Sequence, residues 1–402
     1  MTCTYILAPS AANVLRRRDT RTAARFAVVR FLSILRESRE NQRAARATAA
    51  AGVPAAVPAI TDLLTLGIET SCDDTALALL RGERHVMGAL LSSQIKDHAP
   101  FGGVVPELAS RKHQEALLPL LRSLMESTGV CPKDIGLIAV TAGPGLMGSL
   151  LVGVMTAKAL AQGWGVPLVG VNHLEGHMYA NLVANPELES PFLCMIVSGG
   201  HTEIVLMRGG GDYLLLGDTR DDAAGEAYDK AAKLLGLGYP GGPIIEKLAR
   251  EGDPRAFDFP TPLKGSREVE FSFSGVKTAL RTAVKKLLDA GATQEALPIP
   301  DICASFQRVV TDSLLGKIKL AVRKTGVRRV AISGGVAANT ALRDGLSELG
   351  RRHGWAIFLP PREYCTDNAV MIAAAGYAAY GRGARADLSL CPDPSWRVWK
   401  TR

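Results

Sequence analysis

The sequence is poor in the features that mark several classes of protein. Of its 402 residues only 5% are aromatic, and its seven cysteines are scattered, odd in number and never spaced C-x-x-C. This pattern argues against a disulfide framework and against a thiolate zinc site, and it favours a reducing compartment. No apolar run reaches the length of about 20 residues that a membrane span needs. We therefore expect a soluble protein with no membrane partner.

Positive charge is present in excess, but most of it lies at one end of the chain. The net charge is +8, and residues 1–64 alone hold ten Arg, no Lys and four acids, a net of +6. The other 338 residues therefore carry only +2. A nucleic-acid partner would have to meet a local basic patch, because the body of the protein is nearly neutral.

Residues 1–63 form an Ala/Arg-rich extension that we expect to lie outside the fold and to be disordered. Its acid-poor composition is typical of an organelle transit peptide. The alternative, which we favour, is a wrongly assigned upstream start, with the true protein beginning near Leu63. A transit peptide would place the protein in an organelle matrix, and a misassigned start would leave it in the cytoplasm.

The rest of the chain shows the sequence pattern of a duplicated α/β domain. Residues 64–80 and 192–207 both show an apolar strand, a polar turn and a second apolar strand. Residues 135–160 and 327–346 both show a buried strand, a Gly-rich turn and a helix. This repeat predicts two α/β halves with a ligand site between them. We place the halves at 64–190 and 191–385, followed by a tail at 386–402.

Three Gly-rich turns follow strands, at residues 141–149, 197–203 and 332–340. A turn of this kind presents backbone N–H groups to an anion at the positive end of a helix. Tight turns need glycine in any case, but three at matching places favour a nucleotide or another phosphorylated ligand. None of them fits the P-loop or the dinucleotide-binding pattern.

Several carboxylates have both a structural and a functional interpretation. Asp73 and Asp74 follow the first strand, where an acid can face the cleft or merely cap the turn. Asp229 shares a predicted helix face with Asp222, as a solvated acid or as a partner of a ribose. Asp367 precedes an apolar helix, either as its N-cap or as a ligand.

The segment "NHLEGHMYA" places His173 and His177 on one helix face, as metal ligands or as ordinary core histidines. Asn172 and Glu175 predict an N-cap with a capping box, so the helix would begin at His173. That position favours the neutral imidazole that metals bind. The pattern H-E-x-x-H is missing, which disfavours protease chemistry.

Ten motifs occur in order over about residues 64–381: "GIETSCDDT", "FGGVVPELASRKH", "AGPGLMGSLLVG", "NHLEGHMYA", "VSGGHTE", "DDAAGEAYDKAAKLLGL", "YPGGP", "FSFSGVKT", "SGGVAANTALR" and "CTDNAVMIA". Together they resemble the universal tRNA threonylcarbamoyladenosine transferase family in its bacterial form. The resemblance implies the duplicated actin/Hsp70/sugar-kinase fold, which is ribonuclease H-like.

The resemblance also implies a reaction and a site. In this family L-threonylcarbamoyl-AMP donates its threonylcarbamoyl group to N6 of adenosine 37 in tRNAs that read codons beginning with A, and AMP is released. The implied metal ligands are His173, His177 and Asp367. The implied adenylate- or substrate-binding residues are Ile196, Val197, Ser198, Gly199, Gly200, Asp229, Gly242 and Asn339. The implied catalytic residues are Asp73 and Glu107, with Arg111 and His113 as further candidates in the same segment.

Cofactor and partners follow from the same resemblance. Two histidines and one aspartate suit one divalent ion per subunit, with Fe²⁺ as our first choice and Zn²⁺ as the alternative. The nearly neutral body suggests that a paralogous transferase-complex subunit and a small ATPase supply part of the tRNA surface. Two other classes stay open from the residues: a kinase or chaperone of the same fold would not need the histidines, and a metalloprotease would not need tRNA.

Overall fold

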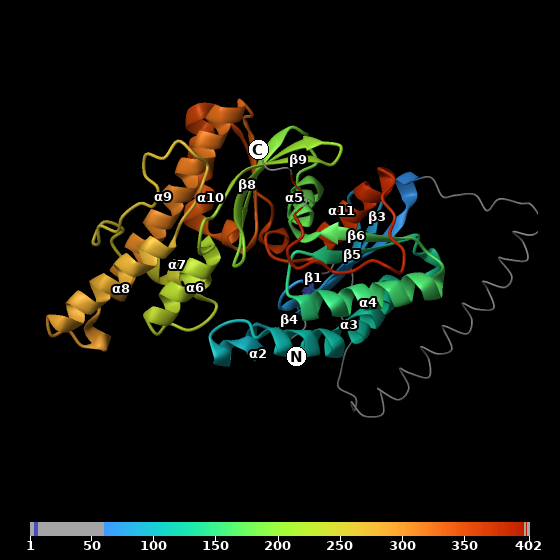
Figure 1. Cartoon of the computed structure of the whole chain (residues 1–402), viewed down its shortest axis with the longest axis horizontal. Helices are drawn as coiled ribbons and strands as arrows, with labels where there is room; N and C mark the ends of the chain where they lie inside the picture. Colours follow the sequence, from blue (N-terminus) through green and yellow to red (C-terminus); the bar gives the residue numbers. More distant parts are fainter. Residues whose placement is uncertain (1–3, 7–59, 398, 400–402) are drawn as a thin grey trace, which may run out of the picture.

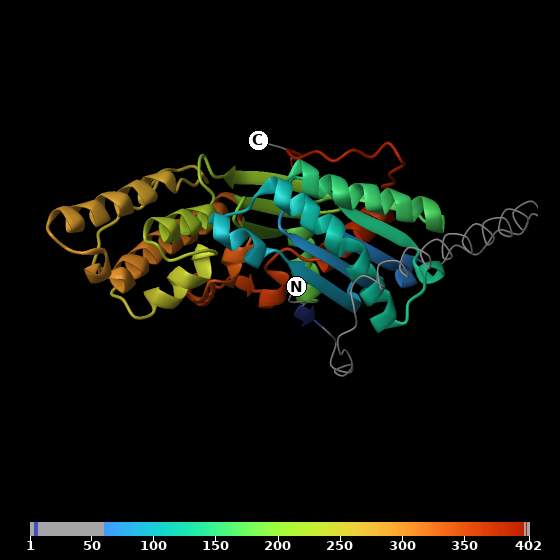
Figure 2. The same cartoon turned by 90° about the horizontal axis from the view of Figure 1, so that it is seen from below.

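A computed structural model describes residues 4–6, 60–397 and 399 of the chain (Figure 1). The prediction of a disordered extension at residues 1–63 falls largely outside these residues. Within it the structure describes the short strand β1 (Thr4–Ile6), which pairs antiparallel with β4, and the 3-10 turn η1 (Ile60–Asp62). The strands of the described residues form two sheets, and helices lie against both (Figures 1 and 2).

The first sheet has the order β1-β4-β3-β2-β5-β6. Strands β2, β3 and β4 are antiparallel neighbours, whereas β5 and β6 run parallel to β2, as expected for strands that reach the sheet through helical crossovers. β2 and β5 are buried along their whole length, as expected for strands covered on both faces. Its elements are β2 (Leu64–Glu69), β3 (Asp74–Arg81), β4 (His85–Ser93), α2 (Ile95–His98), η2 (Ala99–Phe101), α3 (Pro106–Thr128), η3 (Pro132–Asp134), β5 (Leu137–Gly143), α4 (Met147–Trp164), β6 (Leu168–Asn172) and α5 (His173–Ala184).

The second sheet has the order β11-β10-β7-β8-β9 and the same mixed pattern. β7, β8 and β9 are antiparallel, and β10 and β11 add in parallel beside β7. The duplicated strand–turn–strand and strand–turn–helix pattern is therefore confirmed. Its elements are β7 (Phe192–Val197), β8 (Thr202–Gly209), β9 (Asp212–Asp218), α6 (Ala224–Leu234), α7 (Gly241–Ala249), α8 (Ser274–Asp289), η4 (Gln294–Ala296), α9 (Ile299–Thr325), β10 (Arg329–Ser333), η5 (Gly335–Ala338), α10 (Thr340–His353), β11 (Ala356–Phe358) and η6 (Arg362–Tyr364).

The last helix, α11 (Ala369–Gly381), returns to the first half and covers its sheet, in contact with β2, β3, β5 and β6 and beside α5 (Figure 1). Glycines allow this close approach. A Cβ on Gly67 would lie 2.3 Å from the carbonyl oxygen of Ala369, and one on Gly176 would lie 2.8 Å from Ile372 Cδ1. This packing carries Asp367, which comes just before α11, to the helix that holds the two histidines.

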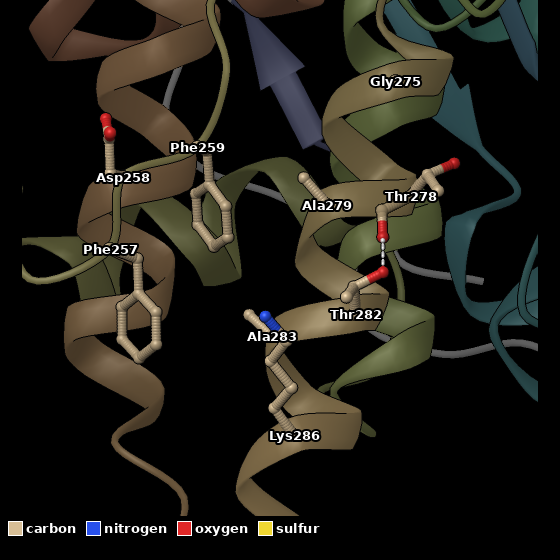
Figure 3. Close-up of a pocket in the computed structure, with 9 residues that line it drawn as sticks. All are labelled: Phe257, Asp258, Phe259, Gly275, Thr278, Ala279, Thr282, Ala283 and Lys286. Carbon is tan, nitrogen blue, oxygen red and sulfur yellow. Dashed lines mark hydrogen bonds between the residues drawn. The ribbon is translucent and has the colours of Figure 1, made fainter.

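α8 lies at the outer edge of the second half (Figures 1 and 2). Residues 257–259 run opposite its outer turns, and the two segments enclose a surface hollow (Figure 3).

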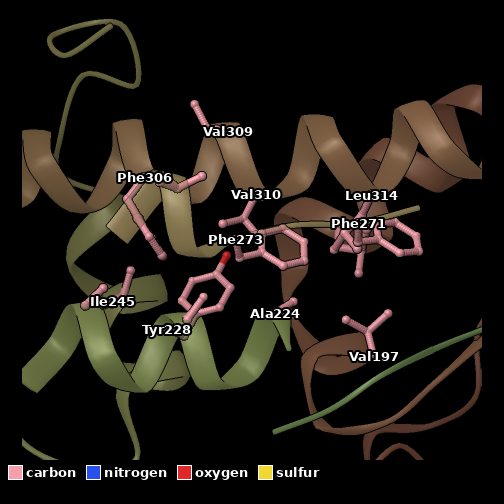
Figure 4. Close-up of a cluster of buried hydrophobic side chains, with 14 of the residues drawn as sticks. Val197, Ala224, Tyr228, Ile245, Phe271, Phe273, Phe306, Val309, Val310 and Leu314 are labelled. Atoms are coloured by element: carbon pink, nitrogen blue, oxygen red, sulfur yellow. The ribbon is translucent and has the colours of Figure 1, made fainter. Parts of the chain in front are cut away.

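The largest apolar core lies between the second sheet and helices α6–α9. Tyr228 on α6 meets Phe306 on α9 edge-to-face at 5.3 Å, with Phe273 in the same cluster (Figure 4). Of two further clusters, one lies between the first sheet and helices α3 and α4, and the other lies under α5 and α11 and includes residues of both sheets. None of the helices in the described part of the chain is both long and apolar enough to cross a membrane.

Candidate active site

Helix α5 begins at His173, as predicted, because Asn172 caps it. Asn172 Oδ1 accepts hydrogen bonds from the N–H groups of Leu174 (2.9 Å) and Glu175 (3.3 Å). The predicted capping box is wrong in its second half. The Glu175 carboxylate turns away from the cap and accepts hydrogen bonds from Tyr213 Oη (2.5 Å) and Arg382 Nη2 (3.0 Å). Asn172 also donates to the carbonyl of Trp396, which ties the tail to the start of α5.

The structure brings His173, His177 and Asp367 together. Oδ1 of Asp367 lies 3.4 Å from Nε2 of His173 and 3.3 Å from Nε2 of His177. One ligand atom from each residue falls within a span of 4.8 Å. Both imidazoles are buried, whereas 24% of the Asp367 side chain remains exposed. The open side of this cluster is therefore at the carboxylate.

The other nitrogen of each imidazole is held by the protein. Nδ1 of His173 lies 3.1 Å from Glu69 Oε2 and 3.2 Å from Ser71 Oγ, and Nδ1 of His177 lies 3.1 Å from Ser333 Oγ. Contacts of this kind fix the ring orientation of metal-binding histidines. Nε2 of His177 is buried and has no hydrogen-bond partner of good geometry. A buried ring nitrogen left in this state, aimed at a carboxylate, fits a cation bound between them.

The carboxylates of Asp367 and Glu69 make the surroundings of His173 favourable for a cation. Burial by itself lowers the pKa of His173, but the carboxylates of Asp367 and Glu69 outweigh it and raise that pKa to about 10. Burial would raise the pKa of Asp367, and the charged His173 instead holds it well below its usual range. The sequence predicted neutral imidazoles from the helix N-terminus. For His173 the two carboxylates override that effect, so a bound metal ion would take the place of its proton.

The interpretation of Asp367 as the N-cap of the apolar helix is wrong. The cap of α11 is Asn368, whose Oδ1 accepts a hydrogen bond from the N–H of Met371 at 3.0 Å. Asp367 lies one residue earlier, and its carboxylate faces the histidines. The two roles that the sequence left open for one residue are thus divided between two neighbours.

Residues Ile196–Gly200 lie beside this cluster. Ile196 pairs with Ser333, whose hydroxyl contacts His177. Ile196 and Val197 are buried, and Ser198 begins the turn with its Oγ accepting from the N–H groups of Gly200 and His201. A Cβ on Gly199 or Gly200 would meet no described atom within 4 Å, so the turn borders open space.

The three Gly-rich turns are not equally free to bind an anion. In the turn at 141–149 the N–H of Gly145 donates to Pro394 and that of Leu146 donates to Ser71. These donors serve packing against the C-terminal tail and against the turn after β2. In the third turn, Gly334 lies against β7, where a Cβ would come within 2.3 Å of the Val197 carbonyl oxygen. The second and third turns therefore lie side by side, next to the histidines.

Asp229, Gly242 and Asn339 lie on the second half. Asp229 Oδ1 accepts a hydrogen bond from the N–H of Gly241 at 2.7 Å, which holds α6 to the start of α7, and Gly242 borders open space. Asn339 is the N-cap of α10 through the N–H of Leu342 (3.1 Å), and it also donates to Gln307 (2.8 Å). The side chains of Asp229 and Asn339 thus each have a structural partner in addition to the predicted ligand.

The charge of Asp73, in the turn after β2, acts on Asp229 of the second half. Burial raises the pKa of Asp73, and the charge of Asp367 raises it further. Burial raises the pKa of Asp74 to about 8, with a contribution from Asp73. The pKa of Asp229 is also raised, by burial and in part by Asp73. The structure therefore gathers Asp73, Asp229 and Asp367 close enough for their charges to interact.

The predicted residues of the "PELASRKH" segment are placed differently. Glu107 is exposed in the first turn of α3 and forms an ion pair with Arg111 at 2.6 Å, not with the histidines. His113 is buried, with Nδ1 2.7 Å from Thr75 Oγ1 and Nε2 2.9 Å from the carbonyl of Cys72. His113 therefore holds α3 against the turn that carries Asp73.

Sequence reasoning missed His201. Its ring centroid lies 6.5 Å from that of His173. Burial lowers the pKa of His201 to about 4, aided by the charge of His173, so the imidazole is neutral. The sequence signal that could have indicated His201 is its position in the turn after β7. β7 and β10 are parallel neighbours, so this turn lies at the same sheet edge as Ser333, the last residue of β10.

Comparison with known proteins identifies the family. The model of TsaD, tRNA N6-adenosine threonylcarbamoyltransferase, matches residues 85–374. The tRNA N6-adenosine threonylcarbamoyltransferase of Anaeromyxobacter dehalogenans (strain 2CP-C) is 49% identical over 334 residues, which cover 83% of this chain and 99% of that relative. The protein of the same description from Desulfitobacterium hafniense is 50% identical over 319 residues, covering 79% of this chain and 93% of that relative.

A likeness among solved structures concerns the fold alone. Full-length HypF in its phosphate- and nucleotide-bound form is 15% identical, with a TM-score of 0.52, and the match covers 85% of this chain and 48% of that one. This agrees with the duplicated α/β fold predicted from the sequence. The chain belongs to the tRNA N6-adenosine threonylcarbamoyltransferase family, and it is a transferase that places a threonylcarbamoyl group on tRNA.

Proposed function

We propose that His173, His177 and Asp367 hold one divalent metal ion, Fe²⁺ in the first place and Zn²⁺ as the alternative. Two imidazoles and a carboxylate are a donor set that suits either ion and leaves coordination positions open for a substrate. The observation that carries this assignment is the buried Nε2 of His177, unpartnered and 3.3 Å from the Asp367 carboxylate. When bound, such an ion supplies a Lewis acid for oxygen atoms of the donor.

We infer that the donor is L-threonylcarbamoyl-AMP and that its adenylate lies along residues 196–200, near Asp229, Gly242 and Asn339. The open space beside Gly199, Gly200 and Gly242 supports this placement. In the reaction a C–N bond forms between the carbamoyl carbon and N6 of the adenine, at position 37 of tRNAs that read codons beginning with A. The anhydride C–O bond breaks, AMP leaves, and N6 loses one proton.

Asp73 is suited to receive that proton. Its burial and the neighbouring charge of Asp367 raise its pKa, which brings a carboxylate closer to the value of an effective base near neutral pH. His113 and its bond to the Cys72 carbonyl fix the turn that presents Asp73. Glu107, exposed and paired with Arg111 at 2.6 Å, is the second residue that we propose to act in catalysis.

The test is the metal content and activity of three purified variants: His173→Ala, His177→Ala and Asp367→Ala. We expect each to lose the bound ion and the transfer of threonylcarbamoyl to a tRNA transcript while keeping the cooperative unfolding of the wild type. His353→Ala, on the exposed end of α10, is the matched control and should keep both. Full metal occupancy in the Asp367 variant would refute a site that joins α5 to the start of α11.

We propose that a paralogous subunit covers the α3–α4 surface and that a small ATPase joins the complex. Met147, Leu151 and Met155 lie at intervals of four residues on α4, with exposures of 51%, 46% and 54%, and Leu118 on α3 is 47% exposed. An apolar stripe of this size is typical of an interaction site. Leu151→Glu should abolish the complex in size-exclusion chromatography and leave the metal content unchanged. Survival of the complex would place the interface elsewhere.

We also propose that residues 64–190 and 191–385 are the two halves of the catalytic unit, that 1–63 are not needed for transfer, and that the protein is cytoplasmic. In support, 83% of this chain already matches 99% of the Anaeromyxobacter relative. A gene that starts at Leu64 should restore the modification to cells that lack this protein. If it yields folded protein but no modification, the extension has a role.

A further inference from the structure

The positive charge of the body is concentrated in one stretch of the second half. Residues 261–330 hold thirteen Lys or Arg and six Asp or Glu, a net of +7, whereas residues 65–402 as a whole carry only +2. The rest of the body therefore has a net charge of −5. A polyanion approaching the body of the protein is therefore attracted to that stretch more than to the rest of the body.

Within this stretch α8 carries three exposed cations within six residues. Arg281, Lys285 and Lys286 are exposed, and none of the three forms an ion pair with a carboxylate of the described residues. Two other cations in the stretch are neutralised: Lys277 pairs with Asp222 (3.1 Å) and Lys324 pairs with Glu268 (2.8 Å). The three α8 side chains thus keep their charge available for a partner.

The same helix borders a hollow with aromatic and hydroxyl groups. The hollow, of about 420 Å³, lies between α8 and residues 257–259 (Figure 3). The rings of Phe257 and Phe259 are nearly parallel, at 10° and a centroid distance of 5.7 Å. Phe257 is half-buried, and Thr278, Thr282 and Lys286 line the opposite side. An aromatic face beside cations and hydroxyls is the combination that binds unpaired nucleotides.

α8 is anchored to the segment that leads into α6, the helix that carries Asp229. Asp221 accepts hydrogen bonds from the N–H of Phe273 (2.7 Å) and from the hydroxyls of Ser272 and Ser274 (2.6 Å each), which fixes the start of the helix. Lys277 bonds to Asp222, just before α6, the helix of Asp229. A helix of 16 residues is about 24 Å long. A ligand lying along it would therefore extend outward from the site.

We propose that the outer face of α8 and its hollow form a docking surface for the substrate tRNA. Arg281, Lys285 and Lys286 contact its phosphates, and Phe257 offers a face to one unpaired base. The proposal rests on tRNA being the substrate and adds the surface that receives it. The occupant follows from charge: the family's substrate is a polyanion, and this described surface joins three unneutralised cations to an aromatic ring.

The test is the salt dependence of binding of an unmodified tRNA transcript to the full chain and its variants Arg281→Ala, Lys285→Ala and Lys286→Ala. Each phosphate contact contributes about 0.7–0.9 to the slope of log K against log salt. Wild-type affinity falls by some factor when the salt is raised from 50 to 200 mM. In each single variant this factor should be about three times smaller than in the wild type, and in the triple variant about thirty times smaller. Lys133→Ala, an exposed cation on the first half, is the matched control and should leave the slope unchanged.

Phe257 is tested separately with Phe257→Leu, which retains apolar volume against the core and removes the aromatic face. We expect affinity to fall about fivefold with an unchanged salt slope. Slopes equal to the wild type in all three α8 variants would overturn the proposal. So would unchanged tRNA binding with lost association of a protein partner, since α8 would then be a protein interface. If the wild-type protein itself fails to modify tRNA in cells, the proposed function is refuted, and not only the proposed docking surface.

Discussion

Asp367 and Asn368 are neighbours with different roles. Substituting each of them singly therefore separates metal binding from helix capping. Asn368→Ala removes the side chain that caps α11 through the N–H of Met371. Loss of such a cap costs about 1 kcal/mol of the free energy of unfolding. Asp367→Asn keeps the size of the side chain but removes the charge that lies 3.3–3.4 Å from both imidazoles. It should leave the cap intact and weaken the metal site.

The magnitude follows from linkage between binding and folding. With free ion at 100 times the wild-type Kd, binding stabilises the folded protein by about 2.7 kcal/mol. If Asp367→Asn weakens binding about 100-fold, the same ion concentration adds only about 0.4 kcal/mol. Without metal, the free energy of unfolding of Asn368→Ala should be about 1 kcal/mol below that of the wild type. Adding the ion should still raise it by the full increment of about 2.7 kcal/mol. Zn²⁺ is the ion to add, because it has no redox chemistry of its own.

The assay is denaturant unfolding of wild type and both variants, with and without Zn²⁺, together with elemental analysis of the purified proteins. Equal metal-dependent stabilisation in wild type and Asp367→Asn would refute the reasoning, since the carboxylate would then contribute nothing to the ion. A loss of the increment in Asn368→Ala would show that the cap and the site cannot be separated in this way.

Three further perturbations test other parts of the structure. Gly67→Ala puts a Cβ 2.3 Å from the Ala369 carbonyl oxygen, so α11 must shift and the metal affinity measured by titration should fall. Gly316→Ala, in open space on α9, is the control and should keep the wild-type affinity. Equal metal affinities in the two variants would contradict the packing argument. Asn339→Ala should cost about 1 kcal/mol through the α10 cap and weaken AMP binding in calorimetry with metal content unchanged; wild-type AMP affinity would remove Asn339 from the adenylate site. Burial, aided by the charge of Asp218, raises the pKa of Glu203 to about 7, above its unfolded value of 4.5, so the folded state holds this proton more tightly and stability falls as pH rises from 4.5 to 7. Glu203→Gln should therefore gain stability over wild type between pH 5 and 8, by at most about 3 kcal/mol in denaturant unfolding, and a pH-independent difference would contradict the shift.

Local patterns in the sequence predicted the elements and the start of α5. The two strand–turn–strand units and the Asn172 cap are confirmed because they depend on neighbouring residues. The return of α11 to the first sheet could not be predicted. That helix is apolar on all sides, so its sequence does not indicate which sheet it covers.

The site was predicted where it depends on residue type and missed where it depends on contacts between distant parts of the chain. The spacing of His173 and His177 showed a shared face, whereas the cap of α11 at Asn368 instead of Asp367 is a shift of one residue that composition cannot resolve. Glu175 left its expected cap because Tyr213 and Arg382, far along the chain, compete for its carboxylate.

The most direct measurement is the amount of threonylcarbamoyladenosine in digested tRNA, determined by mass spectrometry. The tRNA would come from cells without this gene, from cells with the gene restored, and from cells carrying His177→Ala. The modification should vanish with the gene, return with the wild type and stay absent with the variant. An unchanged level in cells that lack the gene would contradict the assigned reaction, and full restoration by His177→Ala would contradict the role of the metal centre.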